Sequence, residues 1–157
     1  MKQLTPSLPN GADANRTLAA GLGLSLRTYG VHNMDEIRNA LAQFDKDRIE
    51  ALILWPTPLM LLHRRAILEF TSHRIPVIGE GPELAQAGAL LTYSADYVEM
   101  WRHAAVYVDK ILKGAKPGDL PIERPTKFVL RVNLNAARAL GITIPESILL
   151  RADEVIR

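Results

Sequence analysis

Six side chains in this sequence could hold a small molecule, and each lies at or just after the end of an apolar run. They are Trp55, Thr57, Glu80, Tyr93, Ser94 and Asp96. An aromatic ring can stack on a ligand, a hydroxyl can share a hydrogen bond with it, and a carboxylate can pair with an amine. These groups bind a solute more readily than they react with it.

Each of these side chains also has a purely structural interpretation. Trp55 can cover the end of the core, and Thr57, between two prolines, can close a turn. Ser94 can cap the helix that follows it, and Asp96 suits the positive end of the helix dipole. Glu80 can be a solvated loop charge. The sequence alone leaves both interpretations open.

Catalytic and metal-binding motifs are missing from the sequence. It has no GxSxG, no GxGxxG after a strand, no P-loop and no HExxH. Cysteine is absent, which excludes thiol catalysis, disulfides and zinc–thiolate sites. Glu99 and His103 are one helical turn apart and could share a metal, although a solvated ion pair is the simpler interpretation. We therefore expect no enzyme activity, no cofactor and no metal.

Hydrophobic patterning predicts the elements that position these residues. Strand-like apolar runs occur at 24–31, 50–56, 75–80 and 88–93. Between and around them, helical periodicity or turn signals occur at 12–22, 34–44, 58–70, 82–87 and 95–113. Alternation of this kind predicts an α/β fold, a three-layer parallel sheet with helices on both faces. Ser94 is the expected cap of the longest helix.

The carboxyl ends of the predicted strands form the expected binding edge. In open parallel sheets, ligands bind where these ends meet the following loops and helix N-termini. The loops concerned are 5–9, 32–33, 55–58, 79–82 and 93–96. All of them carry small, polar or aromatic residues, and the last three contain the six candidates.

Two predicted helices present apolar stripes that need a partner. The stripe of the 58–70 helix is Leu59, Leu62, Ala66 and Phe70. The stripe of the 95–113 helix is Tyr97, Trp101, Ala104, Val108 and Ile111. After the second helix, "KGAKPGDLPIERPTKF" brings three prolines before a strand at 126–134, as a tail, a linker or a crossing between two lobes would. A short helix at 135–141 and a proline-led helical turn with a charged tail follow.

Bulk composition narrows the functional class. The 157 residues are 48% hydrophobic and 23% charged, with a net charge of +2 and no run of five like charges. Nucleic acid is therefore not an expected partner. No apolar run approaches the ~20 residues that span a bilayer. The opening "MKQLTPSLPNG" lacks an apolar h-region, so we expect no signal peptide in this chain.

The C-terminal half of the sequence carries a specific resemblance. The run "ILKGAKPGDLP", "PTKF", "NL-AA-ALG" and "IP-S-L-RADEVI" resembles the C-terminal signature of the ABC transporter substrate-binding protein family. That family comprises periplasmic solute receptors, including receptors for tryptophan and other aromatic amino acids. "LHRRAILEFTSHRIPVI" and "TPSLP" resemble further segments of it. The resemblance covers nearly the whole chain but only the second of the family's two lobes.

The resemblance implies a fold and a function. The fold is one lobe of a type I periplasmic-binding-protein-like architecture. Residues 1–93 would form the α/β lobe, 94–113 a long helix crossing towards the first lobe, 114–126 a proline-rich crossover, and 127–157 the returning strand and C-terminal helices. The function would be the substrate-binding component of an ABC-type importer. Such a protein acts in the periplasm and encloses a small solute, of which an amino acid is one possibility. A membrane permease then recognises the closed receptor.

The implied site consists of the six strand-end residues, with no chemistry performed on the solute. With the first lobe absent, the 95–113 helix would expose its stripe, which favours a homodimer through that helix. Two alternatives come from other classes: a cytosolic flavodoxin-like or response-regulator-like domain, and the sensory domain of a transcriptional regulator. Thr5, Pro6 and Ser7 stand where a receiver domain would need an acidic cluster.

Overall fold

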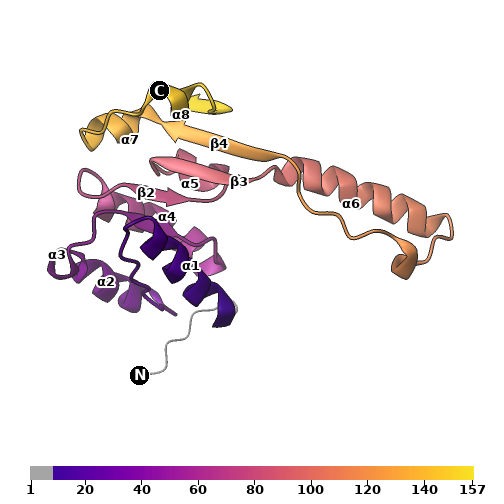
Figure 1. Cartoon of the computed structure of the whole chain (residues 1–157), viewed down its shortest axis with the longest axis horizontal. Coiled ribbons are helices and arrows are strands. Elements are labelled where there is room, and N and C mark those ends of the chain that lie inside the picture. The colour runs from indigo at the N-terminus through magenta and orange to yellow at the C-terminus, as the bar shows by residue number, and fades with distance from the viewer. Residues whose placement is uncertain (1–8) are drawn as a thin grey trace. The chain divides into compact units, whose positions relative to one another are not determined.

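The computed structural model describes residues 9–157, with side chains from Ala14 onward. The chain divides into two compact units, one ending at Arg48 and one running from Ile49 to Arg157. Figure 1 labels most of their helices and strands. Residues 5–8 of the predicted loop at 5–9, including Thr5, Pro6 and Ser7, lie outside the described residues.

The described part of the first unit is helical. It contains α1 (Pro9–Gly21), α2 (Met34–Ala42) and α3 (Phe44–Asp47). The predicted start of α2 is confirmed, because the Asn33 side chain accepts a hydrogen bond from the Glu36 backbone N–H at 2.9 Å. Ile37, Leu41 and Phe44 are buried, as their helical spacing predicts.

The strand predicted at 24–31 is wrong, because this segment pairs with no other strand in the described chain. A strand needs a neighbour to complete its hydrogen bonds, and the described part of this unit offers only helices. Instead, the Tyr29 hydroxyl donates to Asp47 at 2.7 Å, and Arg27 pairs with Asp47 at 2.6 Å. Burial raises the pKa of Tyr29, and the hydrogen bond from Tyr29 lowers the pKa of Asp47.

The second unit is built on a five-stranded sheet. In sheet order the strands are β1 (Leu52–Leu54), β2 (Val77–Gly79), β3 (Leu91–Ala95), β4 (Phe128–Asn133) and β5 (Glu154–Ile156). Neighbouring strands are parallel except β3 and β4, which are antiparallel. The α/β fold with a mostly parallel sheet is confirmed, while the final strand β5 replaces the predicted charged tail.

Helices connect these strands and supply much of the core. They are α4 (Pro58–Thr71), α5 (Pro82–Gln86), α6 (Tyr97–Leu112), a 3-10 turn at Pro117–Asp119, α7 (Leu134–Ala139) and α8 (Glu146–Leu149). Helix α4 buries Ile67, Leu68 and Thr71, so the stripe predicted for it is wrong. Of the predicted stripe, Leu62 is 74% exposed.

The end of β2 requires a glycine. A Cβ at Gly79 would lie 2.2 Å from Cδ2 of Leu84 and 2.9 Å from the Leu54 carbonyl oxygen. Both distances are far inside ordinary contact, so α5 can pack this closely on the sheet only because Gly79 has no side chain.

Helix α6 differs from the other long helix of this unit. It runs away from the end of β3, and the segment after it returns alongside to β4 (Figure 1). None of its 16 residues is buried. The predicted stripe of Tyr97, Trp101, Ala104, Val108 and Ile111 is exposed throughout. The segment between α6 and β4 thus returns the chain from the end of the helix to the sheet (Figure 1).

Candidate functional site

Three of the six predicted residues fall in one row across the sheet. Leu54, Gly79 and Thr92 are aligned on β1, β2 and β3. One position further along these parallel strands stand Trp55, Glu80 and Tyr93. The aligned row is buried, whereas Trp55 is 51% and Tyr93 57% exposed. Trp55 and Glu80 directly follow the last residues of β1 and β2, Tyr93 lies within β3, and Glu80 is partly buried, so the three residues stand side by side at the carboxyl edge of these strands.

Two further aromatic residues complete this edge. The Tyr93 ring stacks on Phe128, the first residue of β4, with centroids 5.4 Å apart and an angle of 18°. The Tyr97 hydroxyl donates to the Glu80 carboxylate at 3.2 Å. Burial, followed by the charge of Glu80, raises the pKa of Tyr97. We call Trp55, Glu80, Tyr93, Tyr97 and Phe128 the aromatic row.

Thr57 and Asp96 lie at the same edge but act as helix caps. The Thr57 hydroxyl accepts a hydrogen bond from the Met60 N–H at 3.3 Å at the start of α4. Asp96 accepts hydrogen bonds from the Val98 and Glu99 N–H groups at 3.1 and 3.2 Å at the start of α6. In both cases the side chain accepts hydrogen bonds from backbone N–H groups in the first turn of the helix. Thr57 and Asp96 therefore hold the N-termini of α4 and α6 beside the row.

Ser94 is not the cap of α6, contrary to the prediction. It lies within β3, pairs with Val129 of β4 and is only 4% exposed. The antiparallel ladder with β4 carries β3 on to Ala95, so the helix begins only after Asp96. Among the described residues, neither the Ser94 hydroxyl nor that of Thr92 has a hydrogen-bond partner. The structure places Ser94 on the buried face, away from the aromatic row.

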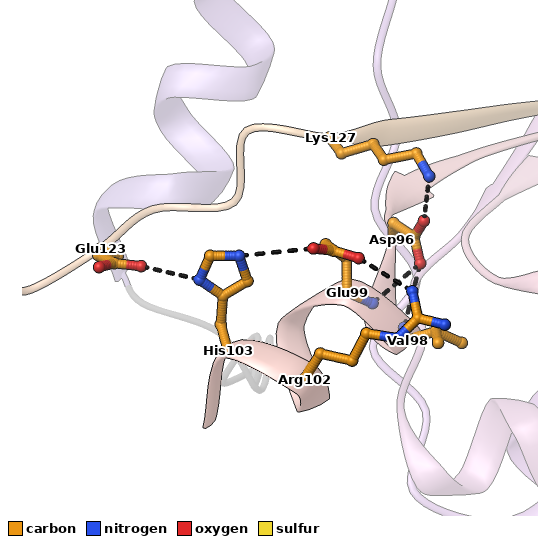
Figure 2. Close-up of polar contacts among 7 residues, drawn as sticks. All are labelled: Asp96, Val98, Glu99, Arg102, His103, Glu123 and Lys127. Carbon is orange, nitrogen blue, oxygen red and sulfur yellow. Dashed lines mark hydrogen bonds and ion pairs between the residues drawn. The ribbon is translucent and has the colours of Figure 1, made fainter. Parts of the chain in front are cut away.

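A chain of charged contacts links α6 to the returning segment (Figure 2). Lys127 pairs with Asp96 at 2.9 Å, and His103 lies between Glu99 at 3.5 Å and Glu123 at 3.1 Å. The hydrogen bond from Lys127 lowers the pKa of Asp96, and the same bond raises the pKa of Lys127. The Glu99–His103 ion pair is the simpler of the two interpretations that the sequence allowed.

A groove of about 640 Å³ runs between α6 and the returning segment. Met100, Ala104 and Tyr107 line it on the helix side, and Pro121 and Ile122 face them. The Tyr107 hydroxyl donates to the Pro121 carbonyl at 2.6 Å and ties the two sides together. In the described chain, no cluster of three His, Asp or Glu side chains is arranged to hold a metal.

Sequence reasoning missed Tyr97, Lys127 and Phe128. Tyr97 looked like part of a buried helix stripe, and the other two lie some thirty residues from the strand-end loops. Only the antiparallel return of β4 beside β3 brings them to this edge. The one available signal was that the proline-rich segment ends at Lys127, where a strand begins.

Solved structures share this fold. A conserved domain protein from Vibrio cholerae O1 biovar El Tor is 25% identical, with a TM-score of 0.78 over 94% of this chain. An ABC domain from Streptococcus pneumoniae in complex with L-Trp is 23% identical, with a TM-score of 0.82 over 94% of this chain. An open, ligand-free substrate-binding protein with adhesive properties from Clostridium difficile is 21% identical, with a TM-score of 0.69 over 96% of this chain.

This chain spans 52%, 50% and 51% of those three chains, about half the length of each. A search of curated proteins gave no match. The structure describes no helix long and apolar enough to cross a membrane. A protein-family model for ABC transporter substrate binding proteins matches residues 11–156, nearly the whole sequence. The chain therefore belongs to the ABC transporter substrate-binding protein family.

Proposed function

We propose that this chain is the second lobe of a solute receptor for an ABC-type importer, and that it binds a small solute at the aromatic row without chemistry. The observation that carries the proposal is the alignment of Trp55, Glu80 and Tyr93 in one row at the carboxyl edge, where both rings are about half exposed. Family membership supports a binding role over a catalytic one. A first lobe would close over this edge and form an interlobe cleft.

The chemistry of the row favours a solute with an aromatic or apolar body and an ammonium group. The rings of Trp55 and Tyr93 offer flat apolar surface, and the Glu80 carboxylate offers a partner for a cation. An amino acid meets this description, as the L-Trp bound to the Streptococcus pneumoniae domain would. Thr57 and Asp96 set the helix N-termini at the same edge, where a solute carboxylate could reach N–H groups. Ser94 would support β3 from the buried face.

The remaining parts of the proposal concern partners and place. The receptor would act in the periplasm and deliver its solute to an ABC permease in the membrane. Residues 1–93 would form the lobe, 94–113 and 114–126 the excursion to the first lobe and back, and 127–157 the return. The exposed α6 would in this chain support a homodimer, since a helix with no buried residue leaves its apolar side open.

Nuclear magnetic resonance titration tests the solute site directly. L-tryptophan added to the isotope-labelled chain should shift the Trp55 indole and the Tyr93 and Phe128 amide signals. Glu80→Gln should weaken this binding about tenfold, because the ammonium loses its carboxylate partner. Glu69→Gln, on the exposed side of α4, is the matched control and should change nothing.

Three outcomes separate the alternatives. Shifts with amino acids but not with sugars or amine-free acids would support the proposed solute class. Shifts with sugars or organic acids alone would support a binding role but overturn the proposal that the solute carries an ammonium group. An absence of shifts at the aromatic row with every solute, in a folded chain, would overturn the proposed site.

A further inference from the structure

The Glu80 carboxylate is held by a neutral donor. Its Oε2 atom accepts a hydrogen bond from the Tyr97 hydroxyl at 3.2 Å, and Glu80 forms no ion pair with any described residue. The lysine at this edge, Lys127, pairs with Asp96 at 2.9 Å instead. A hydroxyl group orients a carboxylate without cancelling its charge, whereas a lysine or arginine would do both. The contact therefore directs Glu80 and leaves its negative charge available to a solute.

The backbone is fixed at both ends of this hydrogen bond. Tyr97 is the first residue of α6 and directly follows the Asp96 cap. Glu80 lies between Gly79, against which α5 packs, and Gly81, whose φ of 84° favours glycine. The freedom that remains belongs to the side chains. The hydroxyl therefore decides where the carboxylate points.

The phenol of Tyr97 is a dependable donor. Burial, and after it the charge of Glu80, raises the pKa of Tyr97 above its ordinary 10.0, so the hydroxyl keeps its proton near neutral pH. Glu80 is only partly buried. A glutamate at such a position samples several rotamers when it has no partner, and a solute that binds it must order them at an entropic cost. The hydrogen bond orders the carboxylate before a solute arrives.

We propose that Tyr97 is a positioning residue that sets the preference of the site for solutes with an ammonium group. Its hydroxyl holds Oε2 of Glu80 and leaves Oε1, which accepts no hydrogen bond from the described residues, for the ammonium. The inference rests on the proposed function and names the residue that makes Glu80 selective. Since Tyr97 begins α6, the same hydrogen bond joins the cation-binding group to the helix that leaves the sheet.

The ammonium preference of the whole chain is the quantity to measure. L-tryptophan and indolepropionate share the indole ring and the carboxylate, and only L-tryptophan carries an ammonium group. In nuclear magnetic resonance titrations, the wild type should bind L-tryptophan with a Kd about tenfold lower. Tyr97→Phe keeps the ring and loses the hydroxyl. It should raise the Kd for L-tryptophan about fivefold and leave the Kd for indolepropionate unchanged, so the preference falls to about twofold.

Tyr107→Phe is the matched control. Tyr107 lies on the same helix, and its hydroxyl donates to the Pro121 carbonyl at 2.6 Å, away from the aromatic row. Both Kd values should stay unchanged in this variant. A double-variant cycle then assigns the effect to Glu80. Tyr97→Phe introduced into Glu80→Ala should change neither Kd by more than about twofold, because the hydroxyl has no carboxylate left to hold.

A solute-free measurement tests the hydrogen bond itself. The Cζ carbon signal of a tyrosine responds to the acceptor of its hydroxyl and can be followed in the isotope-labelled chain near neutral pH. Glu80→Ala should move the Tyr97 signal, because the charged acceptor is lost. Glu83→Gln removes a charge that acts on Tyr97 without a hydrogen bond, and it should move the signal much less. A Tyr97 signal that Glu80→Ala leaves in place would overturn the inference.

The titrations separate this inference from the proposed function. If L-tryptophan shifts the signals of the aromatic row but Tyr97→Phe keeps the full preference, the positioning role is wrong and the solute site stands. If Tyr97→Phe weakens both solutes equally, the hydroxyl acts on the fold or on the indole ring, and the positioning role is wrong again. A wild type that binds both solutes equally overturns the ammonium preference itself. If neither solute shifts those signals in a folded wild-type chain, the proposed site fails, and the role of Tyr97 fails with it.

Discussion

Helices α4 and α6 of the second unit are similar in length and pattern but opposite in their surroundings. α4 buries Ile67, Leu68 and Thr71, whereas α6 buries no residue although its apolar content is at least as high. The comparison shows that an apolar stripe predicts that a helix will be covered, but not by which part of a molecule. Regions that fold on themselves and regions that await a partner can share one sequence signature.

The largest expected difference follows from truncating each stripe. Leu68→Ala should lower the free energy of unfolding by about 3 kcal/mol, because Leu68 is 5% exposed and packs near Val77 and Leu90. Leu112→Ala, at 82% exposure, should change it by less than about 0.5 kcal/mol in dilute, monomeric protein. Urea unfolding measures both. Equal losses would show that α6 is covered within its own chain.

The packing of α5 on the sheet gives the next largest effect. Gly79→Ala should cost about 2 kcal/mol, because its Cβ would overlap Leu84 and the Leu54 carbonyl. Gly118→Ala, in the returning segment, has no neighbouring atom within 4 Å and should be close to neutral. The same urea experiment compares them. If Gly79→Ala were also neutral, the packing of α5 on the sheet would accommodate an added Cβ as easily as the returning segment does, and the contrast between the two regions would fail.

Hydrogen exchange should separate the two regions without any substitution. Backbone amides of β3 should exchange at least about tenfold more slowly than amides in the middle of α6, because β3 is paired on both sides. The measurement requires a concentration at which the chain is monomeric. If α6 is protected as strongly as β3 under those conditions, the contrast between the regions fails. Slower exchange of the α6 amides at high protein concentration would instead sharpen the contrast, because α6 would then be protected by another molecule and not by its own chain.

The smallest expected effect concerns the Asp96–Lys127 pair. The folded pKa of Asp96 lies below its ordinary 3.8, so its stabilisation is present above that pH and is lost as the pH falls through the lowered value. The folded pKa of Lys127 lies above its ordinary 10.5, so its stabilisation is lost as the pH rises through the raised value.

Asp96→Asn keeps a capping side chain and removes the charge. The variant should melt slightly below the wild type near pH 7, and the difference should vanish at about pH 2. Lys116→Met, in the same region but without an ion pair in the structure, controls for general charge effects. A difference that persists unchanged at acid pH would show that the ion pair does not contribute.

Much of the fold was readable from the sequence. Strand–helix alternation identified β1, β2 and β3, and the strand-end rule located Trp55, Glu80 and Tyr93 at one edge. The segment 24–31 was not predictable, because a strand depends on a neighbour that hydrophobic pattern does not name. Ser94 and Asp96 are equally good caps by residue type, and only the pairing of Ser94 with Val129 decides between them. The antiparallel direction of β4, which brings Phe128 to Tyr93, leaves no local signature.

The outgoing and returning chains leave the sheet at the same point. The Asp96 N–H donates to the Lys127 carbonyl at 3.0 Å, and the two side chains form an ion pair beside it. A movement of α6 relative to the sheet would therefore act on β3 and β4 together, beside the stacked rings of Tyr93 and Phe128. A partner that binds the far end of α6 would therefore act, through this junction, on the solute site proposed at the aromatic row.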